Sequence, residues 1–449
     1  MAVKDIKQRA WKFLKRLSAH QGFRRYFFNT SWMFAEQVLR IIAGLFVGIY
    51  VARYLGPEQF GVYSYAAAFV ALFGTIARLG LDGIVVRDLV NHPQERDVYL
   101  GTAFWLKLIG AFVTLGLLAI AVQFTSNDAT TNLYIFIIAS GLIFQSFDVV
   151  DFHFQSKVLS KYVSIARLIQ LALSSILKLY FIFIQADLLW FVLVSLVDQI
   201  TLALSLVFAY WRQKIGSFFR CFDLGTAKVM LINAWPLILS GIAISLYMRI
   251  DQIMIKEMLG EREVGLYSAA VRLSEAWYFV PVIITTSLFP AIVNAKKISQ
   301  ELYNKRLQRL YFIMFYFAVV VALPVTFMAE SIVVTLYGTH YKDAGIVLTV
   351  HIWAGVFVGL GVVNGQWFLA ENLQKIATLN TLIGAAANVV LNYFLIPIYG
   401  IAGVAFATFA SYGIAAYFSL SLYNKTRQQF YRITLAILPK SWREIYGNT

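Results

Sequence analysis

Long runs of apolar residues alternate with short polar segments along almost the whole chain. A helix of about 20 mostly apolar residues can cross the roughly 30 Å hydrocarbon core of a bilayer. The runs are too long for the strands of a membrane barrel, and they lack the required alternation of side chains. The pattern predicts an all-α polytopic membrane protein with twelve spanning helices, at approximately 30–54, 61–83, 101–123, 132–152, 162–184, 188–210, 230–254, 265–290, 310–331, 346–369, 377–398 and 400–423.

The composition agrees with this pattern. Hydrophobic residues occupy 60% of the 449 positions, charged residues 14%, and the mean hydropathy is +0.69, whereas a soluble domain is about 45–50% apolar and about 25% charged. A water-soluble globule of this composition would expose large apolar patches, which excludes soluble enzymes, nucleic-acid-binding proteins and secreted scaffolds. The single cysteine, Cys221, excludes an intrachain disulfide. The five histidines lack metal-ligand spacing, and no cofactor is indicated.

Positive charges are distributed unevenly over the predicted loops. Of 38 Lys and Arg residues, 28 are assigned to the N-terminal segment, the even-numbered loops and the C-terminal segment. Only Arg53, Lys256, Arg262 and Lys342 lie in the odd-numbered loops. Because cytoplasmic loops are enriched in Lys and Arg, both termini are expected in the cytoplasm. Orientation, not nucleic-acid binding, therefore accounts for most of the net charge of +15.

An internal repeat relates residues 54–66 to residues 258–270 at a constant offset of 204. The offset covers six predicted spans, an even number, so the two copies have the same orientation in the membrane. Parallel repeats of this kind are a transporter architecture, and glycine would permit a tight turn and close helix approach in each copy. The identical pairs are Leu55/Leu259, Gly56/Gly260, Gly61/Gly265, Tyr63/Tyr267, Ser64/Ser268 and Ala66/Ala270.

The repeat and the charges predict five segments. Two six-helix lobes cover residues 28–212 and 230–424, and residues 213–229 form a cytoplasmic linker between them. In residues 1–27, apolar positions at helical spacing are interleaved with Lys and Arg, which favours a basic amphipathic helix on anionic lipid. The alternative is a basic tail that only sets orientation. Residues 425–449 are expected to be a cytoplasmic basic tail.

Five segments carry a family resemblance: ARYLGPEQFGVYS at 52–64, RIDQ at 249–252, VGLYSAA at 264–270, LYGTHYKDA at 336–344 and IPIYGIAG at 396–403. With them, the chain resembles the polysaccharide and oligosaccharide flippases of the multidrug/oligosaccharidyl-lipid/polysaccharide exporter superfamily. The resemblance extends from about Asn29 to Tyr423.

The resemblance implies a V-shaped, non-enzymatic transporter of the prokaryotic cytoplasmic (inner) membrane. It would move an undecaprenyl-diphosphate-linked repeat unit to the outer leaflet, by alternating access, for a surface polysaccharide such as O-antigen. The first, second, seventh and eighth helices would line the central cavity. Association with a polymerase and other glycan-assembly proteins is compatible with this function.

Ionisable residues inside the predicted spans gather on those same helices. Each would cost about 2.5–3.5 kcal/mol at the bilayer centre if it faced lipid, so most must face a partner or a wet cavity. Local ion pairs one helical turn apart would make these charges tolerable, and this is the purely structural interpretation. Twelve residues are assigned to the spans, eight of them on spans one, two, seven and eight: Glu36, Arg40, Arg78, Asp82, Lys107, Asp148, Lys178, Asp198, Arg249, Asp251, Arg272 and Glu275.

The functional interpretation assigns substrate contacts to Arg40, Arg78, Arg249 and Arg272, because guanidinium groups suit phosphate oxygens. The carboxylates either orient these arginines or bind a coupling H⁺ or Na⁺, and the two near mid-depth are the better coupling candidates. Lys107 and Lys178 are expected to snorkel to opposite membrane faces. The carboxylates with these two roles are Glu36, Asp82, Asp198, Asp251 and Glu275, of which Asp198 and Glu275 lie near mid-depth.

Three other functions remain open. A multidrug or cation exporter of the same superfamily would want a net acidic cavity, which the four arginines oppose. A membrane enzyme of glycan assembly would need a large loop or domain outside the bilayer, and all predicted loops are short. A non-transporting scaffold would leave the charges within the membrane without a reason.

Overall fold

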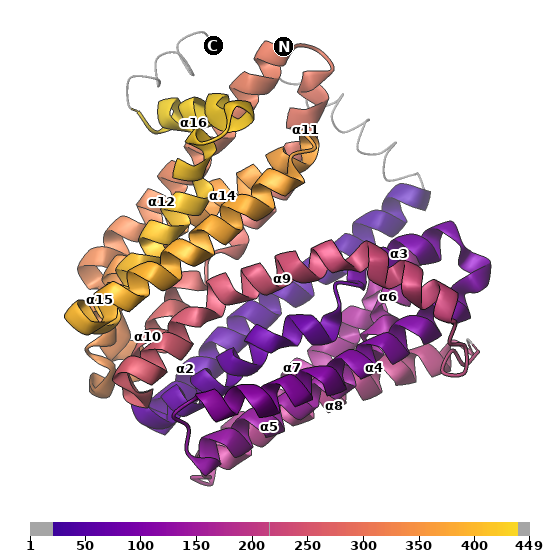
Figure 1. The fold of residues 1–449 in the computed structure, drawn as a ribbon, viewed down its shortest axis with the longest axis horizontal. Helices are drawn as coiled ribbons and strands as arrows, with labels where there is room; N and C mark the ends of the chain where they lie inside the picture. The colour runs from indigo at the N-terminus through magenta and orange to yellow at the C-terminus, as the bar shows by residue number, and fades with distance from the viewer. Residues whose placement is uncertain (1–20, 215, 439–449) are drawn as a thin grey trace, which may run out of the picture. The chain divides into compact units, whose positions relative to one another are not determined.

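A computed structural model describes residues 21–214 and 216–438. These described residues form helices joined by turns and short 3-10 segments and contain no strand, which confirms the all-α prediction (Figure 1). The helices are α2 (Gln21–Arg78), α3 (Asp82–Asn91), α4 (Arg96–Ala121), α5 (Ala129–Phe144), α6 (Val149–Ser156), α7 (Ser160–Phe183), α8 (Leu188–Arg212), α9 (Leu224–Leu259), α10 (Glu261–Glu275), α11 (Phe279–Lys296), α12 (Gln300–Tyr337), α13 (Ala344–His351), α14 (Ala354–Ala370), α15 (Gln374–Ala416) and α16 (Asn424–Ile437).

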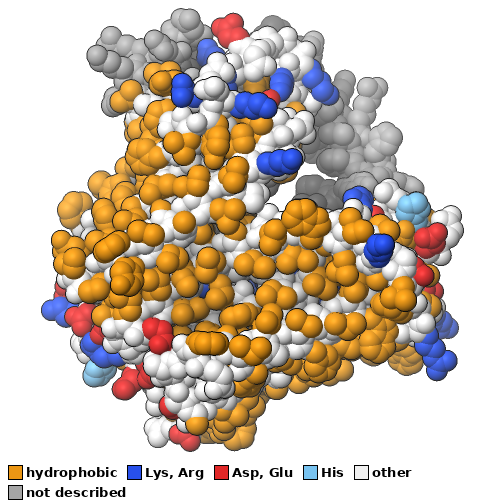
Figure 2. All heavy atoms as spheres, in the orientation of Figure 1, with side chains coloured by type: hydrophobic (Ala, Val, Ile, Leu, Met, Phe, Trp, Pro, Cys, Tyr) orange, Lys and Arg blue, Asp and Glu red, His pale blue; other side chains and the backbone are white. Residues whose placement is uncertain are grey.

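Within the described residues, ten helical stretches are long and apolar enough to cross a membrane. The longest, Ser31–Asn91 and Gln374–Ser421, contain 61 and 48 residues, and each is interrupted by a glycine outside the helical conformation, Gly56 or Gly400. Figure 2 shows a face covered by apolar side chains, with charged side chains gathered toward the helix ends. The chain is a polytopic membrane protein. The count of twelve spans and the cytoplasmic termini stay predictions.

The internal repeat is visible in the backbone. Gly56 and Gly260 occupy equivalent positions at the offset of 204, and their φ angles are +71° and +104°. Residues other than glycine adopt such φ angles only at a cost in conformational free energy. Each glycine directly precedes a helical segment, so both copies of the repeat reverse the chain in the same way.

The second repeated glycine of each copy brings two helices together. A Cβ added at Gly61 would lie 2.7 Å from the carbonyl carbon of Glu261, and one at Gly265 would lie 2.7 Å from the carbonyl carbon of Pro57. Pro57 and Glu261 are themselves related by the offset of 204. The crossing of α2 and α10 is therefore symmetric under the repeat, and the predicted close approach at these glycines is confirmed.

Some predicted helices are interrupted. The eighth and tenth predicted spans, 265–290 and 346–369, lie within the spanning stretches Glu261–Lys296 and Ala344–Ala370, but a short turn divides the first into α10 and α11 and the second into α13 and α14. Residues 84–100, expected as a loop, contain most of α3 and the start of α4. The proposed amphipathic segment at 1–27 lies mostly outside the described residues.

The predicted C-terminal tail begins as a docked helix. In α16, Gln429 donates a hydrogen bond of 2.6 Å to the hydroxyl of Tyr311 on α12. Thr426, Gln429, Ile433 and Ala436 are buried on one face of α16. This helix therefore packs against the bundle along an amphipathic face.

Contacts group the described residues into two compact units. Unit 1 contains the described residues through Val47, with Phe73–Gln123 and Phe136–Ile238. Unit 2 contains Gly48–Leu72, Phe124–Ile135 and the described residues from Leu239 onward. Each has its own core, around Phe104 and Phe218 in unit 1 and around Tyr311 and Met314 in unit 2. The division into lobes at a 213–229 linker stays a prediction.

Candidate functional site

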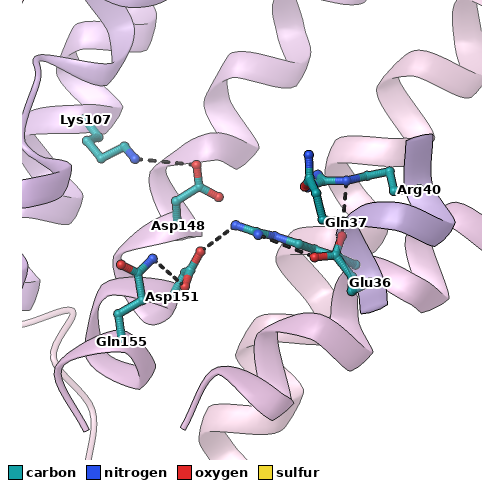
Figure 3. A network of polar contacts seen from close by, with 8 residues as sticks. Glu36, Gln37, Arg40, Lys107, Asp148, Asp151 and Gln155 are labelled. Atoms are coloured by element: carbon teal, nitrogen blue, oxygen red, sulfur yellow. Dashed lines mark hydrogen bonds and ion pairs between the residues drawn. The ribbon is translucent and has the colours of Figure 1, made fainter. Parts of the chain in front are cut away.

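Glu36 lies at the centre of a charged network in unit 1 (Figure 3). Its carboxylate is buried, and Oε1 lies 3.1 Å from Nε of Arg40, one turn further along α2. Arg40 also donates to the side-chain oxygen of Gln37. The predicted ion pair is confirmed, and the side chain of Arg40 remains 40% exposed. A buried acid thus holds an accessible guanidinium in place.

A second arginine, Arg167 on α7, extends the network. Its Nη1 lies 3.9 Å from Oε2 of Glu36, and its Nη2 donates to Asp151 Oδ2 at 2.9 Å. Gln155 donates to the other Asp151 oxygen at 2.9 Å. The sequence-based assignment missed Arg167, grouping it with the cytoplasmic charges, and it missed Asp151 altogether. Arg167 lies inside the predicted span 162–184 and Asp151 inside the predicted span 132–152. Their positions within apolar spans could have identified them as charges within the membrane.

Two lysines are paired with acids on neighbouring segments. Lys107 on α4 is 2% exposed, and its Nζ lies 3.6 Å from Asp148 Oδ2. Lys178 on α7 lies 3.7 Å from Asp198 Oδ2 on α8 and donates to Ser174 at 2.8 Å. The expectation that both lysines snorkel to the membrane faces is therefore wrong, because each ammonium is paired with an acid within unit 1.

The expected pairing of Arg78 with Asp82 along one helix is wrong. α2 ends at Arg78 and α3 begins at Asp82, because Leu79 and Gly80 both have positive φ angles, +55° and +59°. Both charged side chains are exposed, and no ion pair joins them in the described part of the chain. Their expected roles in substrate contact and charge pairing stay predictions.

Asp251 on α9 is the centre of a buried polar cluster in unit 2. Its Oδ2 accepts hydrogen bonds from Tyr267 at 2.6 Å and Thr408 at 2.7 Å, and its Oδ1 accepts one from Asn392 at 2.7 Å. Asn392 also donates to Asn388 at 3.1 Å. No cation pairs with this carboxylate among the described residues, and Oδ1 of Asn392 is buried without a hydrogen-bond partner. Neutral donors alone hold the acid.

The other predicted charges of unit 2 make looser contacts. The guanidinium of Arg272 lies against the backbone of Gly48, where an added Cβ would be 2.8 Å from the central guanidinium carbon. The same carbon lies 5.9 Å from the ring centroid of Phe60. The expected local ion pair of Arg272 with Glu275 is not formed, and α10 ends at Glu275. Glu275 interacts electrostatically with Arg249 and Arg272 without a direct ion pair to either in the described structure.

These arrangements can present positive charge within an apolar surrounding. In this network of unit 1, three acids and three bases balance one another, which makes it tolerable in an apolar surrounding, and its most exposed charged side chain is that of Arg40. Across residues 31–214 and 216–438, no group of three His, Cys, Asp or Glu side chains could hold a metal ion. A shared cavity for Arg40, Arg78, Arg249 and Arg272 stays a prediction.

Comparison with solved structures shows which fold the chain has. It superposes on a lipid II flippase MurJ in an inward closed conformation with a TM-score of 0.70 and 16% identity, over 91% of this chain and 90% of that one. It also matches an inward-facing multidrug resistance transporter of the MATE family with a TM-score of 0.65 and 14% identity, over 89% and 96% of the two chains. At such low identity these matches establish the fold alone.

Sequence comparison extends the likeness to curated proteins. A capsular polysaccharide biosynthesis protein, CapF, of Staphylococcus aureus is 22% identical over 84% of this chain and 94% of its own length. A putative O-antigen transporter of Shigella dysenteriae is 23% identical over 79% of this chain and 89% of its own. A probable low-salt glycan biosynthesis flippase, Agl15, of Haloferax volcanii is 23% identical over 83% and 78%.

The family profile described as polysaccharide biosynthesis protein matches residues 27–296. This range is more than half of the chain, and it includes Glu36 and Arg40, the Asp151 and Arg167 pair and the repeated glycine turns. The expected family resemblance is therefore confirmed, and the chain belongs to the polysaccharide biosynthesis protein family.

Proposed function

We propose that this protein is a flippase that moves undecaprenyl-diphosphate-linked oligosaccharide repeat units from the cytoplasmic to the outer leaflet by alternating access. Family membership, the names of its relatives and the fold shared with a lipid II flippase support this function. The observation that carries it is the accessible guanidinium of Arg40, held within a membrane-spanning helix by buried Glu36. Binding of residues 1–27 to anionic lipid and association with a polymerase belong to the same proposal.

The role of Arg40 follows from its geometry. Its Nε faces Glu36 and one Nη group faces Gln37, which leaves N–H donors for a ligand. A guanidinium offers parallel donors that match phosphate oxygens, and it stays charged under all relevant conditions. Because Glu36 also pairs with Arg167, the acid limits the rotation of two cations at once. Arg40 would bind the diphosphate, and Glu36 would position it.

The test is complementation of a deletion strain, with lipid-linked glycan on the cytoplasmic side as the readout. Arg40→Ala should weaken substrate binding by about tenfold or more, since a hydrogen bond to a charged group contributes about 1.5–3 kcal/mol. Arg40→Lys tests whether charge alone suffices. Arg87→Ala is the matched control, because Arg87 is exposed and pairs with adjacent Asp88 at 2.8 Å. Intact export in an inserted variant with Ala at Arg40, Arg78, Arg249 and Arg272 would refute the assigned contacts.

We propose Asp251 as the site of a coupling H⁺ or Na⁺. A buried carboxylate without a cationic partner is costly when ionised, so a proton or a bound cation would relieve that cost. Oxygen atoms of Asp251, Asn392 and Thr408 would hold the ion, and the unpartnered Oδ1 of Asn392 supports this fit. Asp198, which the sequence favours for coupling, has Lys178 at 3.7 Å and is already compensated.

Transport into proteoliposomes under an imposed Na⁺ or H⁺ gradient tests which of the two acids, Asp251 or Asp198, couples transport to the ion. Asp251→Asn should abolish the acceleration by the gradient and leave slow, gradient-independent transport, whereas Asp198→Asn should keep the acceleration. The opposite pattern would assign coupling to Asp198. Transport of the wild-type chain that ignores both gradients would exclude coupling.

A further inference from the structure

A groove runs between α7 and α8 of unit 1. Its volume is about 760 Å³, which falls within the range of about 300–1,000 Å³ typical of ligand pockets. Its walls include the exposed apolar side chains of Ile165 and Ile169 on α7 and of Leu204 and Phe208 on α8. The lining residues lie only in the half of each helix nearest to Ser160 and Arg212, so the groove is confined to that end of the helix pair.

Three of the lining residues carry hydrogen-bond donors and lie at this end of the helix pair. Arg212 lies in the last turn of α8, Gln213 follows it directly, and Tyr162 lies in the first turn of α7. In the described part of the chain, no hydrogen bond or ion pair involves the Arg212 guanidinium. The Nε2 atom of Gln213 is buried and has no acceptor. Because the Arg212 guanidinium is exposed and has no acceptor among the described residues, this end of the groove suits a ligand with acceptor oxygens.

The charge around this end is positive. No acidic residue lines the groove, and Lys161 and Lys214 are exposed next to lining residues. Lys161 lies 5.6 Å from the ring centroid of Trp32. The positive-inside rule predicts that this end faces the cytoplasm. Apolar walls that end in basic groups at the membrane surface are the pattern of an anionic lipid site.

We propose that the groove between α7 and α8 binds an anionic phospholipid of the cytoplasmic leaflet. The phosphate accepts from Arg212, and an acyl chain lies along Ile165, Ile169 and Phe208. This site is separate from the network around Glu36 and Arg40. None of the ten residues that line the groove belongs to that network. The lipid therefore acts as a bound component of unit 1, independent of the transported substrate.

Native mass spectrometry of the purified full-length chain tests this site. The chain is titrated with phosphatidylglycerol and, separately, with phosphatidylcholine, and retained lipid is counted. Arg212→Gln should weaken phosphatidylglycerol binding by about fivefold to tenfold, since one basic group near an anionic surface contributes about 1 kcal/mol. The matched control is Lys228→Gln, another exposed basic residue near a helix end of unit 1, which should bind normally.

A second pair of variants tests the apolar part without changing charge. Ser205→Trp places a large ring inside the groove and should displace the lipid. Ile176→Trp adds the same ring to an exposed position of α7 that is not part of the groove lining, and it should bind normally. Ser205→Trp also keeps the test informative if Arg212→Gln fails to fold.

Three results would overturn the proposal. The first is equal loss of phosphatidylglycerol in Lys228→Gln and Arg212→Gln, which indicates diffuse surface charge. The second is equal retention of phosphatidylcholine and phosphatidylglycerol, which indicates ordinary bilayer contact. The third is displacement of the lipid by millimolar inorganic phosphate, which indicates an anion site that does not need the acyl chain. Loss in Arg212→Gln and Ser205→Trp alone, with preference for phosphatidylglycerol, supports it.

Discussion

The symmetric crossing of α2 and α10 predicts that adding one methyl group there destabilises the protein. In Gly61→Ala the new Cβ would lie 2.7 Å from the carbonyl carbon of Glu261, whereas ordinary contacts begin at 3.4 Å. The carbonyl oxygen of Glu261 lies closer still, and all the obstructing atoms are backbone atoms, which cannot rotate away. The helices must therefore separate, or the backbone must bend.

The magnitude follows from two opposing effects. Overpacking of this kind costs about 1–3 kcal/mol, while replacing helical Gly with Ala gains up to about 1 kcal/mol in helix propensity. Gly116 in α4 has nothing within 4 Å of its Cβ position. Gly116→Ala should therefore gain helix propensity without any cost of overpacking. We expect Gly61→Ala and Gly265→Ala to be destabilised by about 1–2 kcal/mol, and Gly116→Ala to be neutral or slightly stabilised.

The assay is unfolding of the purified chain in detergent, compared among wild type, the three single variants and the Gly61→Ala/Gly265→Ala double variant. Because both methyl groups obstruct one crossing, the separation caused by the first should relieve part of the second, and the double variant should cost less than the sum. Equal stability of Gly61→Ala and Gly116→Ala would refute the close crossing. A loss of stability in the double variant that equals the sum of the two single losses would refute a crossing shared by both glycines.

Three further predictions concern charged groups. Glu36→Gln should destabilise unit 1 by about 1.5–3 kcal/mol, the usual contribution of a hydrogen bond to a charged group, because Arg40 and Arg167 remain 40% and 29% exposed and stay partly solvated. Chemical unfolding measures this, and a loss below about 1 kcal/mol would contradict the network. Lys107→Met should be tolerated much better when combined with Asp148→Asn than alone, because the double change leaves no unpaired buried charge, and a stability cycle of the four proteins checks this. Hydrogen bonds from the hydroxyl and the backbone N–H of Thr131, the latter 2.9 Å long, lower the pKa of the Asp128 carboxyl. The resulting stabilisation of α5 should be complete above the ordinary carboxyl pKa of about 3.9. It should be lost as the pH falls through the lowered pKa of Asp128. Melting temperatures of wild type and Asp128→Asn should therefore converge in acid, and a constant gap would exclude this role.

The sequence predicted what depends on local order along the chain. Apolar runs of about 20 residues predicted spanning helices, since a membrane segment must satisfy its own backbone. Glycines at a constant offset predicted the repeated turns, and Gly56 and Gly260 share the positive φ angles that such turns need. The pairing of Glu36 with Arg40 was also predictable, because residues four apart share a helix face.

Local spacing failed where the helix itself was interrupted. Arg78 and Asp82 have the same spacing as Glu36 and Arg40, but Leu79 and Gly80 turn the chain between them. Likewise, the break between α10 and α11 interrupts a continuous apolar run. Hydrophobicity alone does not locate such breaks, since an apolar residue suits a membrane segment on either side of a bend.

The sequence by itself thus determined the class of protein, the family and the repeat, because all three depend only on composition and on the order of residues along the chain. Only the tertiary structure decided the partners of the buried charges: Asp148 for Lys107, Arg167 for Glu36, and neutral donors for Asp251. The physical reason is distance along the chain. These contacts join residues 16 or more positions apart, and helix packing, which no periodicity encodes, brings them within a few ångströms of each other.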